Sequence, residues 1–290
     1  MIQLDQTRGS VCTVRRAATM PISDSLIRPS FEDPNVADRF QLAAALNELA
    51  NSAGLLRQKR WSVSLPEAAG RTLILTLETQ PGSSSELEEV LTWKIERSFG
   101  VSFEELAITR EKLPADSQGR DRYIVIAIRR SVLDDYENLF AASGWRCGLI
   151  LPRHMGEARW LTRNGFKGDS LLLSSSNSGF TAVVFRGKQP LILRSVTCEA
   201  EEREDELYRL LLFYRERRVG AGEQSDQTLS RLLVIGEGLT KDRASEIVNE
   251  TLGTHLRVLD ATNLGLQLPG RELSFDSIAA PAGLATLAWP

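Results

Sequence analysis

Residues 169–260 constrain the fold most, because strands and helices alternate there in one fixed order. The stretch "DSLLLSSSNSGFTAVVFRGKQPLILR", residues 169–194, is typical of three strands joined by two polar turns. The next run, "EEREDELYRLLLFYRERR", predicts a helix that is acidic at its start and basic at its end. A buried-type strand in "RLLVIGEG", a second helix and the strand "LRVLD" complete the series. This alternation predicts an α/β unit.

The N-terminal part of the chain repeats this plan with a block inserted in it. The run "IQLDQTRGSVCTVRRAATMPI" predicts a hairpin, and a helix and the strand "RWSVSLP" follow. The inserted block then has the order strand, helix, strand, strand. Its helix is expected to begin at Ser85, with Glu88 completing a capping box, and a later helix at Ser131 with Asp134.

We therefore predict two related α/β halves with one insertion. Residues 1–69 form the N-terminal part of the first half, and residues 70–148 form the inserted subdomain. Residues 149–168 return to the first half, and residues 169–290 form the second half. The small-residue segment "SIAAPAGLATLA" near the C-terminus is expected to pack closely on a sheet.

Composition excludes several classes of protein. The net charge of −3 disfavours a nucleic-acid partner, which usually requires a basic excess. Three widely spaced cysteines, Cys12, Cys147 and Cys198, and only two histidines, His154 and His255, predict neither a disulfide framework nor a metal centre. No apolar run approaches the roughly 18 residues of a membrane span, and no signal-peptide pattern opens the chain. We expect a cytoplasmic protein that reaches a membrane only through a partner.

Catalytic motifs are also missing from the sequence. The chain has no GxxxxGK[ST] loop, no GxSxG elbow and no HExxH pair. No catalytic residue is therefore expected.

Four stretches of the chain resemble the PilM family of type IV pilus assembly proteins. They are "WSVSLP", "LEEVLTWKIERSFGVSFEELAITREKLP", "DRYIVIAIRRSVLDDYENLFAASGWRCGLILP" and "APAGLATLA". The family is related to the cell-division actin FtsA and to the cytoplasmic part of GspL. The resemblance implies an actin-like α/β fold, in which two RNase H-like halves flank a nucleotide cleft and a strand–helix–strand–strand subdomain is inserted.

The resemblance also implies a partner. In the family, the short cytoplasmic N-terminal tail of a PilN-like bitopic membrane protein lies in a groove beside the inserted subdomain. Capture of an extended peptide in this way uses apolar anchors and backbone hydrogen bonds. The residues expected to line the groove are Leu91, Ile95, Tyr123, Ile126, Leu149 and Leu151.

The sequence departs from the phosphate loops that this resemblance implies. Actin-like ATPases carry Asp-x-Gly at the first loop, and here Asp5 keeps the acid while Thr7 replaces the glycine. The second loop reads Ser174-Ser175-Ser176 with Thr181 beyond, and serine supplies no charge for Mg²⁺. The purine-side loop keeps Gly236 and Gly238.

These departures favour a scaffold over an enzyme. The degenerate nucleotide site would consist of Asp5, Ser174, Ser176, Thr181, Gly236 and Gly238. A hairpin and turns without a ligand explain the same residues, so we expect no cofactor, with ATP and Mg²⁺ as the alternative. The expected function is a non-catalytic scaffold (a pseudo-ATPase) of a type IV pilus or type II secretion-like inner-membrane assembly platform. The alternatives are an actin-like ATPase and an FtsA-like filament former, which would self-associate.

Overall fold

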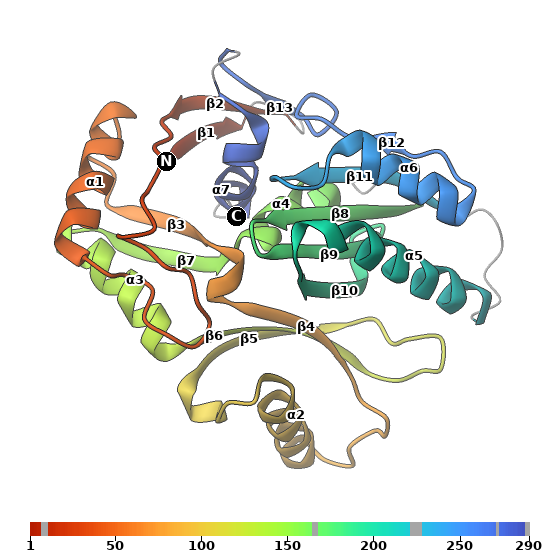
Figure 1. The fold of residues 1–290 in the computed structure, drawn as a ribbon. Helices are drawn as coiled ribbons and strands as arrows, with labels where there is room; N and C mark the ends of the chain where they lie inside the picture. Colours follow the sequence, from red (N-terminus) through yellow and green to blue (C-terminus); the bar gives the residue numbers. More distant parts are fainter. Residues whose placement is uncertain (7–10, 164–167, 221–227, 271–272, 288–290) are drawn as a thin grey trace.

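The structure of the protein is a computed structural model, and it describes residues 1–6, 11–163, 168–220, 228–270 and 273–287. Figure 1 shows two α/β halves side by side and a smaller lobe beneath them. The lobe is the inserted subdomain, and the strands of each part form sheets of their own.

The second half contains a five-stranded sheet in the order β10-β9-β8-β11-β12. Its strands are β8 Asp169–Ser176, β9 Gly179–Arg186, β10 Gln189–Thr197, β11 Leu229–Ile235 and β12 Arg257–Val258. The first three strands are antiparallel, whereas β11 runs parallel to β8 and to β12. The chain passes through α5 Arg203–Gly220 and α6 Lys241–Leu252 between the later strands. This confirms the series of strands and helices expected for residues 169–260.

Both faces of this sheet are covered, which explains its continuous apolar strands. Leu171 and Leu173 point to one side, where they pack in a core with the buried side chains of α5 and α6. Leu172 points to the other side, toward α4 Arg153–Arg163 and α7 Phe275–Leu287.

The first half has a divided sheet. A hairpin of β1 Ile2–Gln6 and β2 Cys12–Ala17 pairs with the short strand β13 Leu266–Gln267. A separate parallel pair consists of β3 Arg60–Leu65 and β7 Arg146–Pro152. Two helices, α1 Arg39–Ser52 and α3 Arg130–Ala142, pack against β3 and β7. Because β13 pairs with β2, the C-terminal part of the predicted second half returns to the first half.

The inserted subdomain has the predicted order of elements. It consists of β4 Arg71–Thr76, α2 Ser84–Phe99, β5 Leu106–Leu113 and β6 Arg122–Arg129. The strands form an antiparallel sheet in the order β4-β6-β5, and α2 packs its buried face on that sheet. Short 3₁₀ turns lie before β4, before β5 and before α5, at η1 Glu67–Ala69, η2 Phe103–Glu105 and η3 Ala200–Glu202.

Two helix starts differ from the prediction. The cap of α2 is Ser83, whose hydroxyl accepts from the backbone N–H of Glu86, and the Glu86 carboxylate accepts from the N–H of Gly82 at 2.7 Å. The N-cap therefore lies two residues before the predicted one, and Glu86 accepts from Gly82 rather than from the cap residue, so the predicted capping box is not formed. Helix α3 begins directly after β6 with no side-chain cap, because Arg129 rather than Ser131 precedes its first turn.

Helix α7 crosses α4 at very close range. A Cβ on Gly283 would lie 1.8 Å from the carbonyl oxygen of Gly156, and a Cβ on Gly156 would lie 2.2 Å from the carbonyl oxygen of Ala280. The indole N–H of Trp160 donates to the carbonyl oxygen of Ala279 at 2.8 Å. The small residues that were expected to pack on a sheet therefore mainly serve a helix–helix contact.

No helix among the described residues is long and apolar enough to cross a membrane.

Candidate functional site: the cleft between the two halves

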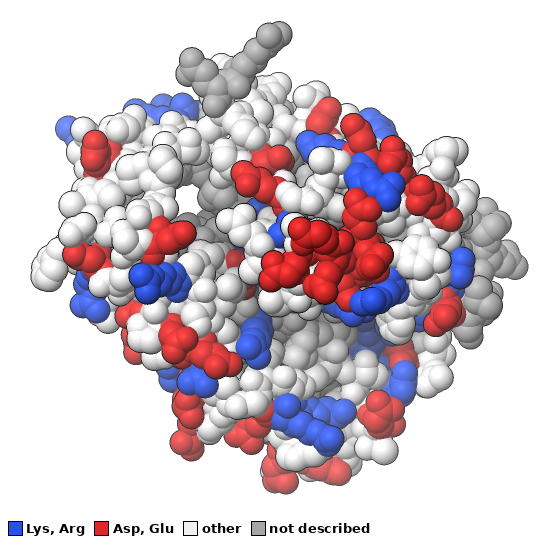
Figure 2. All heavy atoms as spheres, in the orientation of Figure 1, with Lys and Arg blue, Asp and Glu red and all other residues white. Residues whose placement is uncertain are grey.

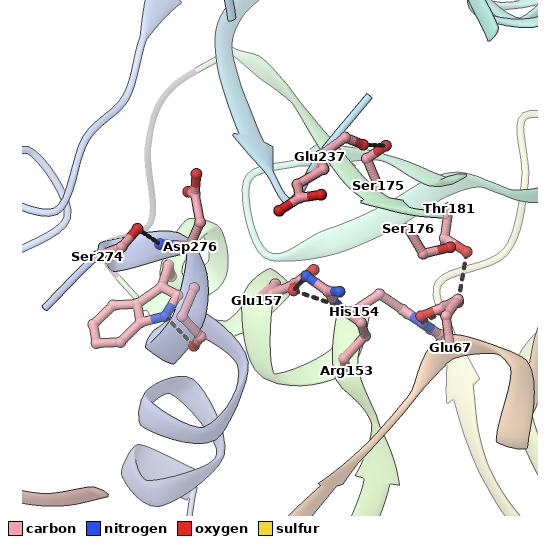
Figure 3. Close-up of polar contacts among 12 residues, drawn as sticks. Glu67, Arg153, His154, Glu157, Ser175, Ser176, Thr181, Glu237, Ser274 and Asp276 are labelled. Atoms are coloured by element: carbon pink, nitrogen blue, oxygen red, sulfur yellow. Dashed lines mark hydrogen bonds and ion pairs between the residues drawn. The ribbon is translucent and has the colours of Figure 1, made fainter. Parts of the chain in front are cut away.

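Glu67 joins three parts of the molecule, and Figure 3 shows its contacts with Thr181 and His154. It lies in η1, where the chain leaves β3 for the inserted subdomain. His154 Nδ1, at the start of α4, lies 2.8 Å from Glu67 Oε1. Thr181 on β9 of the second half donates its hydroxyl to the same oxygen at 2.5 Å. One carboxylate thus connects the first half, the second half and the base of the subdomain.

A second buried pair lies one turn along α4. Arg153 Nε donates to Glu157 Oε1 at 2.8 Å, and Glu157 is fully buried. The i,i+4 spacing places the two side chains on one face of the helix. Three polar atoms here have no hydrogen-bond partner among the described residues: His154 Nε2, Glu157 Oε2 and Ser174 Oγ.

Burial and neighbouring charges set the protonation of this cluster. Burial alone would raise the pKa of Glu67, but His154, Thr181 and Arg153 together hold it below its usual value. Burial alone would lower the pKa of His154, but the carboxylate of Glu67 raises it above its usual value. Burial raises the pKa of Glu157 in spite of Arg153. The cluster therefore favours an imidazolium at His154 paired with a carboxylate at Glu67.

Arg203 binds the tip of the β8–β9 hairpin. This side chain is 3% exposed and lies at the start of α5. Its Nη2 donates to the carbonyl oxygens of Ser176 and Asn177 at 2.7 and 2.8 Å, and its Nη1 donates to that of Glu237 at 2.9 Å. The Ser175 hydroxyl also donates to the Glu237 carbonyl, as Figure 3 shows. The hairpin tip therefore presents carbonyl oxygens to a cation.

The two glycines of the predicted purine-side loop are explained by these contacts. Gly236 has φ +96°, and a Cβ there would lie 2.1 Å from the carbonyl oxygen of Ser175. A Cβ on Gly238 would lie 1.7 Å from Arg203 Nη1. Glycine is needed at both positions because the loop after β11 packs directly on the hairpin and on Arg203.

The predicted nucleotide residues are only partly brought together. Ser174 and Thr181 lie in the cleft, and Thr181 contacts Glu67. The Ser176 hydroxyl donates within the hairpin, to the Gly179 carbonyl at 3.3 Å. Asp5 lies on β1 and pairs with Arg15 at 3.6 Å, with both side chains about half exposed. Thr7 lies outside the described residues.

The central residues of the cluster were missed by sequence reasoning. Sequence reasoning assigned His154 no role beyond arguing against a metal centre, and the structure pairs it with Glu67, 87 positions away. No spacing in the sequence connects those two positions. The spacing from Arg153 to Glu157 was visible, but it is also typical of an exposed helix face.

The predicted groove residues need a correction. Leu91 and Ile95 are fully buried between α2 and its sheet, and Tyr123 is 7% exposed in the same core. Ile126 is also 7% exposed, because β6 is the central strand of its sheet. These four side chains are not available to a peptide.

The other two predicted groove residues, Leu149 and Leu151, are half-buried on β7. They remain candidates for contact with a peptide.

A groove does lie beside the inserted subdomain, but it is built from other residues. Its volume is about 750 Å³, and it separates β4 of the subdomain from β10 of the second half. Each of these strands is the edge of its sheet. Apolar walls come from Leu73, Leu193 and Val196. We call it the β4–β10 groove; the six predicted groove residues are not among its lining.

Comparison with known proteins places the fold. No protein-family model and no curated protein matches the chain. A chain of the PilM-PilN type IV pilus biogenesis complex matches with a TM-score of 0.76 and 17% identity, covering 100% of this chain and 95% of that chain. A Bacteroides thetaiotaomicron protein with an actin-like ATPase fold has a TM-score of 0.45 and 12% identity, with 83% of this chain and 80% of that chain covered.

A third structure is the cytoplasmic domain of EpsL, an inner membrane component of the type II secretion system of Vibrio cholerae. It has a TM-score of 0.43 and 15% identity, covering 84% of this chain and 80% of that chain. The conclusion rests on the first structure, because that match extends over the whole chain. The expected resemblance in fold is confirmed: the protein has the actin-like α/β fold with an inserted strand–helix–strand–strand subdomain.

Proposed function

We propose that the protein is a non-catalytic scaffold of a type IV pilus or type II secretion-like assembly platform at the inner membrane. The observation that carries the proposal is the full-length match in fold to a chain of the PilM-PilN complex. The proposed partner is a PilN-like membrane protein, bound through its cytoplasmic N-terminal tail.

The β4–β10 groove is the proposed site for this tail. Its two edge strands offer backbone hydrogen bonds to an extended peptide, and Leu73, Leu193 and Val196 offer apolar contacts. The groove also borders the cluster around Glu67, whose residues Glu67 and Thr181 form part of its lining.

The absence of catalysis is proposed from the cleft. A phosphate-binding hairpin presents backbone N–H groups to its anion, whereas the carbonyl oxygens of Ser176 and Asn177 accept from Arg203. The carboxylates of Glu67 and Glu157 are opposed by His154 and Arg153 and need no metal ion. These contacts favour a structural clamp over an ATPase site.

Membrane attachment is proposed to depend on the partner. Figure 2 shows acidic side chains gathered over η3 and the start of α5 on the face that it presents, and the sequence there contains Glu199, Glu201, Glu202, Glu204, Asp205 and Glu206. Such a surface repels anionic lipids, and lipid attraction usually needs clusters of roughly 4–8 Lys or Arg.

Co-flotation with liposomes tests the recruitment. The protein should float only when the liposomes display a PilN-like tail, and strong flotation without the tail would refute the proposal. Leu73→Ala combined with Val196→Ala should weaken tail-dependent flotation, because both side chains line the β4–β10 groove. Leu149→Ala and Leu151→Ala distinguish the β4–β10 groove from the groove predicted from the sequence. They should weaken flotation only if the tail binds in the sequence-predicted groove.

Calorimetry with Mg-ATP tests the alternative of an actin-like ATPase. We expect no binding up to about 1 mM nucleotide, the weak end of specific affinity. Low-micromolar affinity would refute the proposed absence of a nucleotide site. Sedimentation at rising protein concentration tests the filament-forming alternative, for which large assemblies would be the supporting result.

A further inference from the structure

The sheet of the first half lacks a pairing that the second half has. In the second half, β8 pairs with β9 on one side and, in parallel, with β11 on the other. The corresponding strands of the first half are β1, its hairpin partner β2, and β3, which follows α1 as β11 follows α5. Among the described residues, however, β1 pairs only with β2, and β3 pairs only with β7. The sheet is therefore open between β1 and β3.

A cavity of about 760 Å³ lies in this opening between β1 and β3. Leu46 and Leu49 of α1 and Phe140 of α3 line it on one side, and Ala280 and Ala285 of α7 line it on another. Helix α7 contacts both β1 and β3. We call this cavity the β1–β3 slot, and Figure 1 shows β1 and β3 as separate ribbons.

The slot walls carry polar groups without partners. Trp61 Nε1, Ser64 Oγ and Asp276 Oδ1 are buried and unpaired within the described part of the chain, and all three residues line the slot. The facing edges of β1 and β3 add backbone N–H and C=O groups that none of the described strands pairs. Buried polar groups are normally hydrogen-bonded, so this combination points to an occupant that carries donors and acceptors along its length.

The size of the slot fits a short strand. Five strand residues occupy roughly 800 Å³, from a rise of about 3.3 Å per residue, a strand spacing of about 4.8 Å and a layer thickness of about 10 Å. The slot volume of about 760 Å³ is close to that value. An extended peptide also has the two rows of backbone groups that the two strand edges require, which a compact small molecule lacks.

The outer end of the slot is basic. A neighbouring cavity of about 430 Å³ shares Gln3, Leu55 and Gln58 with the slot. Arg57 lines that cavity and Arg60 lines the slot, and both are exposed without an ion pair to any described residue. Charge complementarity therefore favours acidic residues at this end of the occupant.

We propose that the β1–β3 slot binds an extended segment of another polypeptide, which adds as a strand between β1 and β3. Apolar or β-branched side chains of the segment face α1 and α7 alternately, and an acidic residue faces Arg57 and Arg60. The mode is strand addition, which takes its affinity from backbone bonds and its specificity from alternate side chains. This site is separate from the β4–β10 groove and goes beyond the proposed function.

Hydrogen exchange of the full chain tests the proposal, with the synthetic peptide EEVTVTVEE as the probe. In the free protein, amides of β1 and β3 should exchange at least about tenfold faster than those of β8, because open edges are less protected than a central strand. The peptide should slow exchange in β1 and β3 but not in β4 and β10. A version methylated on its backbone nitrogens, and the version KKVTVTVKK, should have no such effect.

Two kinds of variant check the geometry. Ala285→Phe fills the slot from α7 and should abolish the protection. Arg57→Glu combined with Arg60→Glu should weaken peptide binding at least about tenfold, which corresponds to about 1.4 kcal/mol. Lys188→Glu, in an exposed turn of the second half, is the matched control and should change nothing. If Ala285→Phe does not fold, the peptide affinity of the double arginine variant tests the proposal instead.

Several results would overturn the proposal. Protection of β1 and β3 equal to that of β8 in the free protein would mean that the sheet is closed in solution. Protection that rises with protein concentration without peptide would assign the slot to a second copy of this chain. Protection confined to β4 and β10, or absent up to about 1 mM peptide, would also refute it. None of these results bears on tail-dependent flotation, so the two proposals fail separately.

Discussion

Glu67→Gln removes one negative charge from the buried cluster and preserves the volume of the side chain. The exposure of the two partners sets the expected magnitude, because the side chain of His154 is 1% exposed and that of Glu67 is 14% exposed. Exposed ion pairs contribute about 0–1 kcal/mol, whereas breaking a buried pair by removing one partner costs about 3–5 kcal/mol. The lower end of the range for buried pairs applies for two reasons. The Gln side chain still accepts a hydrogen bond from Thr181, and His154 can lose its proton. We expect the free energy of unfolding to fall by about 3 kcal/mol.

The pH dependence of stability should change as well. The folded-state pKa of His154 lies above 6.5, so its contribution is complete below that pH and is lost as the pH rises through the folded pKa. The folded-state pKa of Glu67 lies below 4.5, so its contribution is present above that pH and is lost as the pH falls through the folded pKa. The pair is therefore most stabilising between pH 4.5 and 6.5.

In the variant, the carboxylate that raises the pKa of His154 most is gone, so burial should lower that pKa, against the smaller opposing effect of Glu157. The loss of stability above pH 6.5 should then disappear. Burial raises the pKa of Glu157, so its own contribution is lost as the pH rises above 4.5. That contribution is common to wild type and variant, and their difference at each pH removes most of it.

Urea unfolding followed by circular dichroism between about pH 5 and pH 9 measures both effects. Glu88→Gln is the matched control, because Glu88 pairs with Arg110 in the inserted subdomain and its side chain is 54% exposed. The control should lose much less stability than Glu67→Gln, because solvent screens an exposed ion pair. Equal losses in the two variants, or an unchanged slope above pH 6.5 in Glu67→Gln, would refute the buried pair as a source of stability.

Two further substitutions test the contacts that hold the cleft together. Gly283→Ala should lower the free energy of unfolding by about 3 kcal/mol or more, because its Cβ meets the Gly156 carbonyl and must force α7 away from α4; thermal unfolding measures the loss. Arg203→Met should cost about 3 kcal/mol and should speed hydrogen exchange in the β8–β9 hairpin, because the carbonyl oxygens of Ser176 and Asn177 lose this donor and that of Glu237 keeps only Ser175. Arg209→Ala, at an exposed pair with Glu206, is its control and should cost less than about 1 kcal/mol.

The elements of the fold were predictable where local pattern and burial agree. The runs around Leu172 and Leu233 are apolar throughout because their strands are buried on both faces, and the sequence predicts them as strands. Helix α6 lies between the two strands where a helix was expected, and it ends at Gly253 in the left-handed region. The block from β4 to β6 also follows its predicted order, since α2 and its sheet form a local core.

The cleft was less predictable, because its contacts join distant parts of the chain. Glu67 meets His154 and Thr181 across 87 and 114 positions, and no periodicity encodes such pairs. The buried face of α2 misled the groove prediction, since Leu91 and Ile95 follow the helical period of a core. The opening between β1 and β3 was also hidden, because each strand has an ordinary strand pattern and only pairing reveals a missing neighbour.

The missing phosphate-loop residues and the contacts of the cleft explain each other. A loop that holds phosphate needs glycine for close backbone approach and an acid for its metal ion, and serines occupy those positions in the second loop of this chain. The hairpin carbonyl oxygens accept from Arg203, and the carboxylates of Glu67 and Glu157 pair with His154 and Arg153. We infer that these protein groups hold the two halves together. A cleft closed in this way keeps the β4–β10 groove, which Glu67 and Thr181 border, in one shape, and a scaffold that binds an extended tail benefits from that pre-organisation.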